Sequence, residues 1–234
     1  MINMMHLKND IKQIFKNPIV TMLFILPIFL SVLGRLIITM LIPYLNQYVA
    51  LDPSPYFSFI LAAIITEVPV SLGIVTGFIM LDDRDGNIFD LMRVTPLGSS
   101  GYILNRLAFP FAASFLFTFI VYFIMDIYRL PIVSLILLAL LCGLISIIIT
   151  MAMFFIATDK VKGLTYAKAL NLFSLFTLAD LLKLKWFSSL SLAVPSYWVT
   201  KVVQNPASAL TFVLAFAVSG VWVFGVLLIW RRKA

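Results

Sequence analysis

The sequence DDRDGNIFDLMRVTPLG, Asp82 to Gly98, is a short charged segment in a chain that is otherwise mostly apolar. It contains four carboxylates and two arginines. Uncharged, largely apolar runs flank it on both sides, from Val68 to Leu81 and from Leu107 to Met125. Two apolar runs of this kind around one compact polar segment are typical of two membrane spans joined by a loop in water.

Composition identifies the class of protein. Hydrophobic residues make up 62% of the 234 positions and charged residues 12%, with a mean hydropathy of +1.09. A soluble domain has about 45–50% apolar and about 25% charged residues, so a soluble globular chain is excluded. The net charge of +7 comes with no basic stripe or base-stacking motif, and we expect no nucleic acid among the partners. The sequence predicts an all-α integral membrane protein in a lipid bilayer, with a single transmembrane domain over residues 1–234.

Six transmembrane helices can be placed on the apolar segments. A helix crosses the hydrocarbon core in about 20 residues, and each span is expected to be helical because lipid offers no partners to backbone polar groups. The predicted spans are about Ile19–Ile42, Phe59–Met80, Ile103–Met125, Ile132–Ala157, Tyr166–Leu182 and Ala207–Trp230.

Lysine and arginine are distributed unequally between the two sides of this topology. With the N-terminus in the cytosol, twelve basic residues lie inside and four lie outside. The positive-inside rule therefore places both termini in the cytosol, and we expect a bacterial cytoplasmic membrane. The inside residues are Lys8, Lys12, Lys16, Arg84, Arg93, Arg106, Lys160, Lys162, Lys168, Arg231, Arg232 and Lys233. The outside residues are Arg129, Lys183, Lys185 and Lys201.

Residues 1–17 precede the first span and have their own periodicity. Leu7, Ile11 and Ile14 fall on one helical face, and three lysines fall toward the other. This pattern predicts an interfacial helix that lies on the cytosolic surface, the alternative being a polar tail with chance periodicity.

Residues 184–206 are apolar enough for a weak seventh span, which would place the basic C-terminus outside. The alternative is a re-entrant helical hairpin in the outer leaflet. Pro195 would break the hairpin, and Tyr197 and Trp198 would lie at the interface, where amphipathic rings are enriched. We favour the hairpin because it keeps the charge rule intact.

The cytosolic loop, residues 81–102, has the pattern of a short capped helix. Asp85 is a candidate N-cap, Gly86 allows a sharp entry, and Pro96 ends the helix. The apolar face carries Ile88, Leu91 and Met92, and the polar face carries Asp90 and Arg93. Such a helix needs a surface to pack on, which is either lipid or another protein.

This loop resembles the cytosolic loop of type-2 ABC-transporter permeases. The matching residues are DGNIFDL, Asp85 to Leu91, then VTPL, Val94 to Leu97, followed by a tyrosine and an arginine. The flat N-terminal helix, six spans, outer hairpin and the run PSYW, Pro195 to Trp198, also agree with that family. Asn87 departs from the pattern, where threonine is commoner.

The resemblance implies a mechanism and two partners. The loop helix would be a coupling helix that docks on a separate ABC ATPase subunit. Asp90 and Arg93 would pair at the rim, and the side chains inserted into the ATPase would be those of Ile88, Phe89, Leu91 and Met92. A second permease protomer, identical or related, would complete the transporter. The ATPase-coupling residues would be Asp85, Gly86, Ile88, Phe89, Asp90, Leu91, Met92 and Arg93.

The same resemblance implies an ATP-driven exporter of an amphiphilic drug or peptide, in which this chain is the permease subunit. The sequence contains no G-x-x-x-x-G-K-[ST] phosphate cradle, so this chain is not expected to be an ATPase. ATP and magnesium would bind to the partner, and we expect no cofactor on this chain.

Three charged residues, Arg35, Glu67 and Asp180, fall within predicted spans, where a charge costs about 2.5–3.5 kcal/mol. Arg35 and Glu67 are at similar depth on consecutive spans. They either form an ion pair that fixes the first two helices or line a polar export path. Asp180 can reach the outer surface beside Lys183.

Gly73 and Gly77 form a G-x-x-x-G motif in the second span, which allows helix backbones to approach closely. The partner helix belongs either to the same chain or to a second protomer. We expect packing within the chain.

Enzymatic functions are disfavoured. The chain has one histidine, His6, and one cysteine, Cys142, which excludes a His/Cys metal cluster and a Ser-His-Asp triad within the membrane. The rival function is a proton- or ion-coupled secondary transporter that uses Glu67 or Asp180 as its carrier. A third alternative is a membrane subunit that anchors an ATPase without transporting anything.

Overall fold

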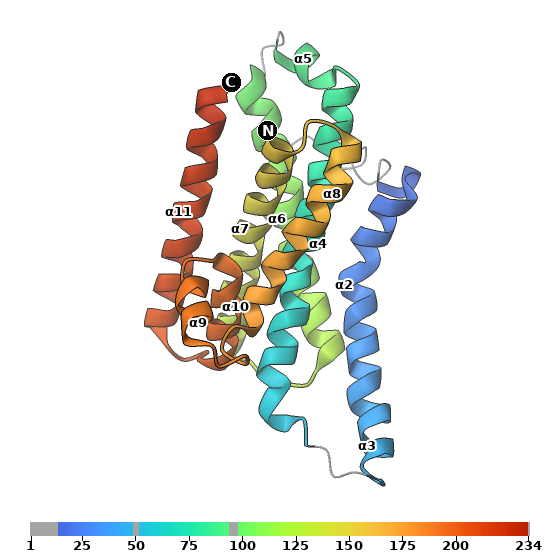
Figure 1. The fold of residues 1–234 in the computed structure, drawn as a ribbon, viewed down its shortest axis with the longest axis vertical. Coiled ribbons are helices and arrows are strands. Elements are labelled where there is room, and N and C mark those ends of the chain that lie inside the picture. The colour runs from blue at the N-terminus through green and yellow to red at the C-terminus, as the bar shows by residue number, and fades with distance from the viewer. Residues whose placement is uncertain (1–13, 49–51, 94–97, 234) are drawn as a thin grey trace.

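The computed structural model of the chain describes residues 14–48, 52–93 and 98–233, and every regular element within these ranges is a helix (Figure 1). Residues 1–13 of the predicted interfacial helix lie outside the described residues. The long helices are α2 (Pro18–Leu36), α4 (Phe57–Asp85), α6 (Gly98–Met125), α7 (Ile132–Ile156) and α11 (Ala209–Lys233). The shorter elements are the π-helix η1 (Ile37–Leu41), α3 (Ile42–Leu45), the 3-10 helix η2 (Ser54–Tyr56), α5 (Ile88–Arg93), α8 (Lys160–Asn171), the 3-10 helix η3 (Leu172–Leu178), α9 (Lys185–Ser191) and α10 (Pro195–Gln204).

Five helical segments are long and apolar enough to cross a membrane, which makes this a multi-pass membrane protein. They coincide with five of the six predicted spans. Their bounds are Pro18–Leu45, Ser54–Asp85, Gly101–Met125, Ile132–Ile156 and Ala209–Arg231.

The sixth predicted span, Tyr166–Leu182, has a different form. Here α8 passes directly into η3, and the segment packs against α4 along its length. Three lysines in α8 and Asp180 after η3 lower its apolarity, so it is not among the five apolar segments. The two helices together extend about 32 Å, which is enough to cross a bilayer. A sixth crossing therefore stays a prediction.

The helices α4 and α7 form the centre of the bundle. In the most apolar stretch of α4, 72% of the residues are buried, and in that of α7, 61%. The corresponding share is 11% in the first span and 22% in α11. The central helix α4 contacts α2, α6, α7 and α8. The outer helices present apolar side chains outward, as expected next to lipid.

Gly73 and Gly77 bring α4 into direct contact with α7. A Cβ atom at Gly73 would lie 2.9 Å from the carbonyl oxygen of Ser146, and one at Gly77 would lie 2.5 Å from Met153 Cγ. The Thr150 hydroxyl also donates a hydrogen bond of 3.1 Å to the Gly73 carbonyl oxygen. The G-x-x-x-G motif therefore packs helices within the chain, as predicted.

Residues 184–206 fold as two short helices at the end of the bundle opposite α5 (Figure 1). Pro195 is the first residue of α10, and the indole N–H of Trp198 donates to the Leu192 carbonyl oxygen over 2.9 Å. Helices of seven and ten residues are too short for a single seventh span. That the hairpin enters the outer leaflet stays a prediction.

Candidate functional site

The charged loop begins with a turn that differs from the predicted one. The backbone N–H of Gly86 still donates to the Asp82 carbonyl oxygen, so α4 continues to Asp85. Asp85 therefore ends α4 and does not cap α5, and its carboxylate accepts a hydrogen bond of 3.3 Å from the backbone N–H of Lys160. Asn87 makes the turn with φ of 58°. Asparagine is among the few residues that tolerate this left-handed conformation, which accounts for Asn87 here.

The predicted loop helix is α5, and its apolar side chains point in two directions. Phe89 and Met92 are partly buried and pack on the core of this chain. Ile88 and Leu91 face outward, with exposed fractions of 37% and 64%. Within this conformation only Ile88 and Leu91 are free for insertion into a partner, where four apolar side chains were expected. Of the α5 side chains, those of Asp90 and Arg93 lie outside the described part of the structure.

Phe89 links α5 to three long helices. Its ring makes edge-to-face contacts with Tyr102 of α6, Phe154 of α7 and Trp230 of α11, at centroid distances of 5.4, 5.8 and 6.0 Å. This geometry is favourable for aromatic pairs beyond the apolar area that it buries. Phe89 therefore connects α5 by direct contact to α6, α7 and α11.

A buried ion pair joins the two helices that flank α5. The Asp83 carboxylate, 1% exposed, is paired with the Arg106 guanidinium and accepts a hydrogen bond of 2.6 Å from the Tyr102 hydroxyl. Both donors lie near the start of α6. We did not predict this pair from the sequence, although Tyr102 and Arg106 are four residues apart and thus share one helix face.

Arg84 reaches from α4 to the end of α7. Its guanidinium donates to the carbonyl oxygens of Phe154, over 3.2 Å, and of Ala157, and it lies 5.1 Å from the centroid of the Phe154 ring. The last carbonyl groups of a helix have no partner within the helix and attract a cation. Arg84 therefore stabilises this end of α7.

Asp82, Asp83 and Arg84 each contact a different neighbouring helix. The Asp82 carboxylate pairs with Lys160 Nζ of α8 at 2.7 Å, while Asp83 reaches α6 and Arg84 reaches α7. Successive residues of a helix point about 100° apart, so three consecutive residues can reach three neighbours. Residues 82–84, at the end of α4 just before α5, thus connect this end of α4 to α6, α7 and α8.

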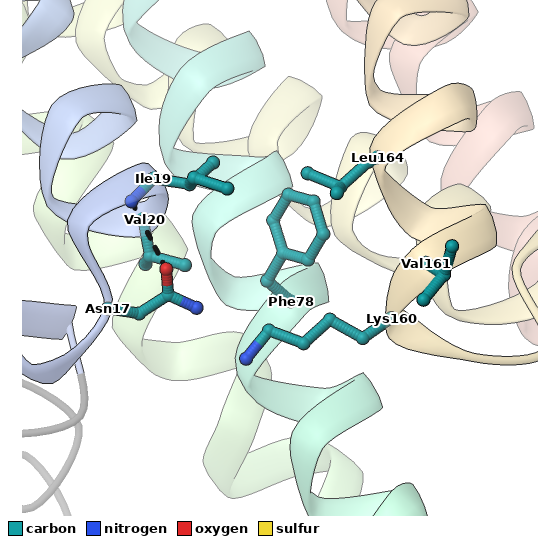
Figure 2. Close-up of a pocket in the computed structure, with 7 residues that line it drawn as sticks. All are labelled: Asn17, Ile19, Val20, Phe78, Lys160, Val161 and Leu164. Carbon is teal, nitrogen blue, oxygen red and sulfur yellow. Dashed lines mark hydrogen bonds between the residues drawn. The ribbon is translucent and has the colours of Figure 1, made fainter.

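A small cavity lies between α2, α4 and α8 (Figure 2). Its volume is about 150 Å³, below the roughly 300–1,000 Å³ of drug-sized sites. At this volume the cavity is too small for a drug-sized substrate in this conformation. The residues that line it are Asn17, Ile19, Val20, Phe78, Lys160, Val161 and Leu164.

Arg35 does not form the suggested ion pair with Glu67. Its guanidinium turns toward the end of α6, where it donates to the Ile124 carbonyl oxygen at 2.7 Å and lies 3.8 Å from the Asp126 carboxylate. Glu67 instead lies near the Ser174 hydroxyl of η3. Similar depth on two helices did not produce contact because the two side chains lie on different faces.

Asp180 pairs with α10 and not with Lys183. Its carboxylate lies 2.7 Å from Lys201 Nζ and accepts a hydrogen bond of 3.2 Å from the Tyr197 hydroxyl. Tyr197 thereby anchors the α9–α10 hairpin to the end of η3. None of the described residues forms a group of three or more histidine, cysteine, aspartate or glutamate side chains that could hold a metal ion.

The chain is therefore a multi-pass helical membrane protein in which ion pairs of Asp82 and Asp83 join the end of α4, next to the short loop helix α5, to α8 and α6. The chain belongs to the Rv2686c-like family, described as fluoroquinolones export permease protein, whose model matches residues 10–231. Its relatives include the fluoroquinolones export permease proteins MT2760 and Rv2686c of Mycobacterium tuberculosis strains CDC 1551 and H37Rv. Each is 28% identical over 202 residues, which is 83% of this chain and 78% of the relative.

Membership in this family agrees with the resemblance to type-2 ABC permeases that the loop sequence indicated. It identifies the chain as a permease, a non-enzymatic membrane subunit, within a family of exporters. No solved structure matches the chain.

Proposed function

We propose that the chain is the permease subunit of an ATP-driven exporter, and that α5 is the helix on which a separate ABC ATPase docks. The observation that carries this proposal is the divided surface of α5. Leu91 and Ile88 are exposed, while Phe89 on the opposite face is held by three long helices. A docking helix needs both an exposed apolar face and a rigid connection to the parts that it moves.

The cargo and assembly follow from the relatives and from the chain's charge pattern. The relatives are named for export of fluoroquinolones, so we propose an amphiphilic drug-like cargo. We also propose a second permease protomer, two ATPase subunits, a bacterial cytoplasmic membrane, and a cytosolic location for the α5 end and both termini. The excess of lysine and arginine on that side supports this orientation.

Replacing Leu91 by aspartate is expected to reduce the amount of ATPase that co-purifies with the permease at least about 10-fold, or 1.4 kcal/mol of binding free energy. A charge would replace an apolar anchor that is 64% exposed in this chain. The matched control is Tyr48→Asp, because Tyr48 is 72% exposed near α3, at the opposite end of the bundle (Figure 1).

The Leu91→Asp permease should have the same elution volume in gel filtration and the same melting temperature as wild type. A loss of ATPase binding then cannot be a consequence of misfolding. Unchanged ATPase retention in Leu91→Asp would overturn the docking site.

The second candidate, a proton- or ion-coupled transporter, is favoured by Glu67, which forms no ion pair within the described residues. In that case, collapsing the ion gradient would stop transport while ATP depletion would not.

Phe89→Ala should have a different effect from Leu91→Asp. The ATPase should still co-purify and hydrolyse ATP, because Phe89 points into this chain, while transport falls about 10-fold or more. The ring contacts to Tyr102, Phe154 and Trp230 would be lost, and with them the transmission of force from α5. Transport into vesicles and ATP hydrolysis, measured on the same preparation, separate these effects. Loss of the ATPase from Phe89→Ala would instead mean that Phe89 contacts the partner.

A further inference from the structure

Glu67 is a carboxylate within the membrane-spanning part of α4, and it forms no ion pair in the part of the chain that the structure describes. The Ser174 hydroxyl lies near it. That hydroxyl donates its one proton to the Asn171 carbonyl oxygen over 2.8 Å, so the proton is not available to Glu67. Glu67 is therefore poorly satisfied in an environment where ionisable groups are costly and are retained for function.

The helix α4 and the α8–η3 segment pack antiparallel, in a register that two contacts determine. Glu67 lies against Ser174. Phe78 lies against Gly163, where an added Cβ atom would be 3.1 Å from Phe78 Cε1. Eleven residues separate the two contacts on both segments, so the register is continuous between them.

This register brings two further polar side chains to the level next to Glu67. Ser71 is one turn from Glu67 on the same face of α4, and Asn171 is one turn from Ser174. Ser71 is fully buried, and neither its Oγ atom nor the Oδ1 atom of Asn171 has a hydrogen-bond partner among the described residues. Two unpaired buried acceptors beside one unpaired carboxylate are unusual in a packed helix seam.

We propose that Glu67, Ser71, Asn171 and Ser174 form a binding site for the ammonium group of a cationic amphiphile. The inference rests on the proposed export function and names the part of the cargo that this seam recognises. The site is closed in this conformation, and the ligand enters when α8–η3 moves away from α4.

The chemistry of the four side chains selects an ammonium group. A primary ammonium carries one positive charge and three donors, which match the carboxylate, the Ser71 hydroxyl and the Asn171 amide oxygen. A proton on Glu67 would remove the charge but would leave the other two acceptors unpaired. An anion has no counter-charge here, because α7 contains no charged residue and Lys201 is already paired with Asp180.

The test uses two fluorescent probes that differ only at the ammonium group, dansylcadaverine and its N-acetyl derivative. Binding of each is titrated to the permease in lipid nanodiscs, alone and with its ATPase. Wild type should bind the amine at least 10-fold more tightly than the acetylated probe. Glu67→Gln should abolish this preference, and Ser71→Ala, a small change in case Glu67→Gln fails to fold, should reduce it several-fold.

The control variant is Asp180→Asn, which removes a carboxylate that already has Lys201 as its partner and should leave the preference unchanged. Equal binding of both probes to wild type, or a preference that survives in Glu67→Gln, would overturn the proposal. Loss in Glu67→Gln with no change in Ser71→Ala would overturn the multi-acceptor site and leave a simple acid. Because the binding measurement needs no ATP hydrolysis, its failure is distinguishable from failure of the Leu91 docking test.

Discussion

Asp83→Asn is expected to lower the free energy of unfolding by about 3–5 kcal/mol, because it removes the buried carboxylate charge that pairs with the Arg106 guanidinium. The two side chains are 1% and 13% exposed, so solvent does not screen the loss. In this variant the Tyr102 hydroxyl would also donate to a neutral amide oxygen, which is a weaker acceptor than the Asp83 carboxylate. Reversible unfolding by sodium dodecyl sulfate in mixed micelles measures the difference.

The adjacent residue offers a matched control. Asp82→Asn breaks an ion pair with Lys160 of 2.7 Å, but those side chains are 41% and 38% exposed. Exposed pairs contribute about 0–1 kcal/mol, so this variant should stay close to wild type. Equal losses in the two variants would contradict the distinction between a buried and an exposed pair, and with it the role of Asp83 in joining α4 to α6.

The long helices could be predicted from the sequence because hydropathy alone determines them. Lipid leaves a backbone no alternative to internal hydrogen bonds, so an apolar run of sufficient length must be helical. The form of residues 166–182 could not be predicted in the same way, because it depends on contacts with residues that are far away in the sequence. Ser196 and Thr200 of α10 donate to the carbonyl oxygens of Phe173 and Thr177, in the part of the segment that is a 3-10 helix. Those contacts span 23 residues and leave no local pattern.

The presence of the short loop helix α5 could also be predicted from the sequence, but not the contacts that it makes within the chain. A short amphipathic helix between two spans identified α5, whereas the side chains that it buries depend on where α6, α7 and α11 lie. Phe89 is the clearest case, because its ring meets residues from all three helices. The pairing of Arg35 with Asp126 has the same cause, since depth in a membrane gives no information on which face a side chain occupies.

Gly73→Leu is expected to lower the free energy of unfolding by about 3 kcal/mol, at the upper end of overpacking effects. A Cβ atom there would lie 2.8 Å from Ile149 Cβ and 2.9 Å from the Ser146 carbonyl oxygen. That oxygen belongs to the backbone of α7, so relief requires the two central helices to separate. Separation would also break the hydrogen bond from Thr150 to the Gly73 carbonyl oxygen. The same mixed-micelle unfolding assay measures the loss.

Gly220→Leu is the matched control, because a Cβ atom at Gly220 of α11 would meet nothing within 4 Å. It should leave stability unchanged or raise it by up to about 1 kcal/mol, since glycine is a poor helix former. If Gly73→Leu were as stable as wild type, α4 and α7 would not form a rigid unit. A movement of α5 would then be lost between these two helices. A destabilised Gly220→Leu would instead show that another surface covers α11, which is where a second protomer would then be sought.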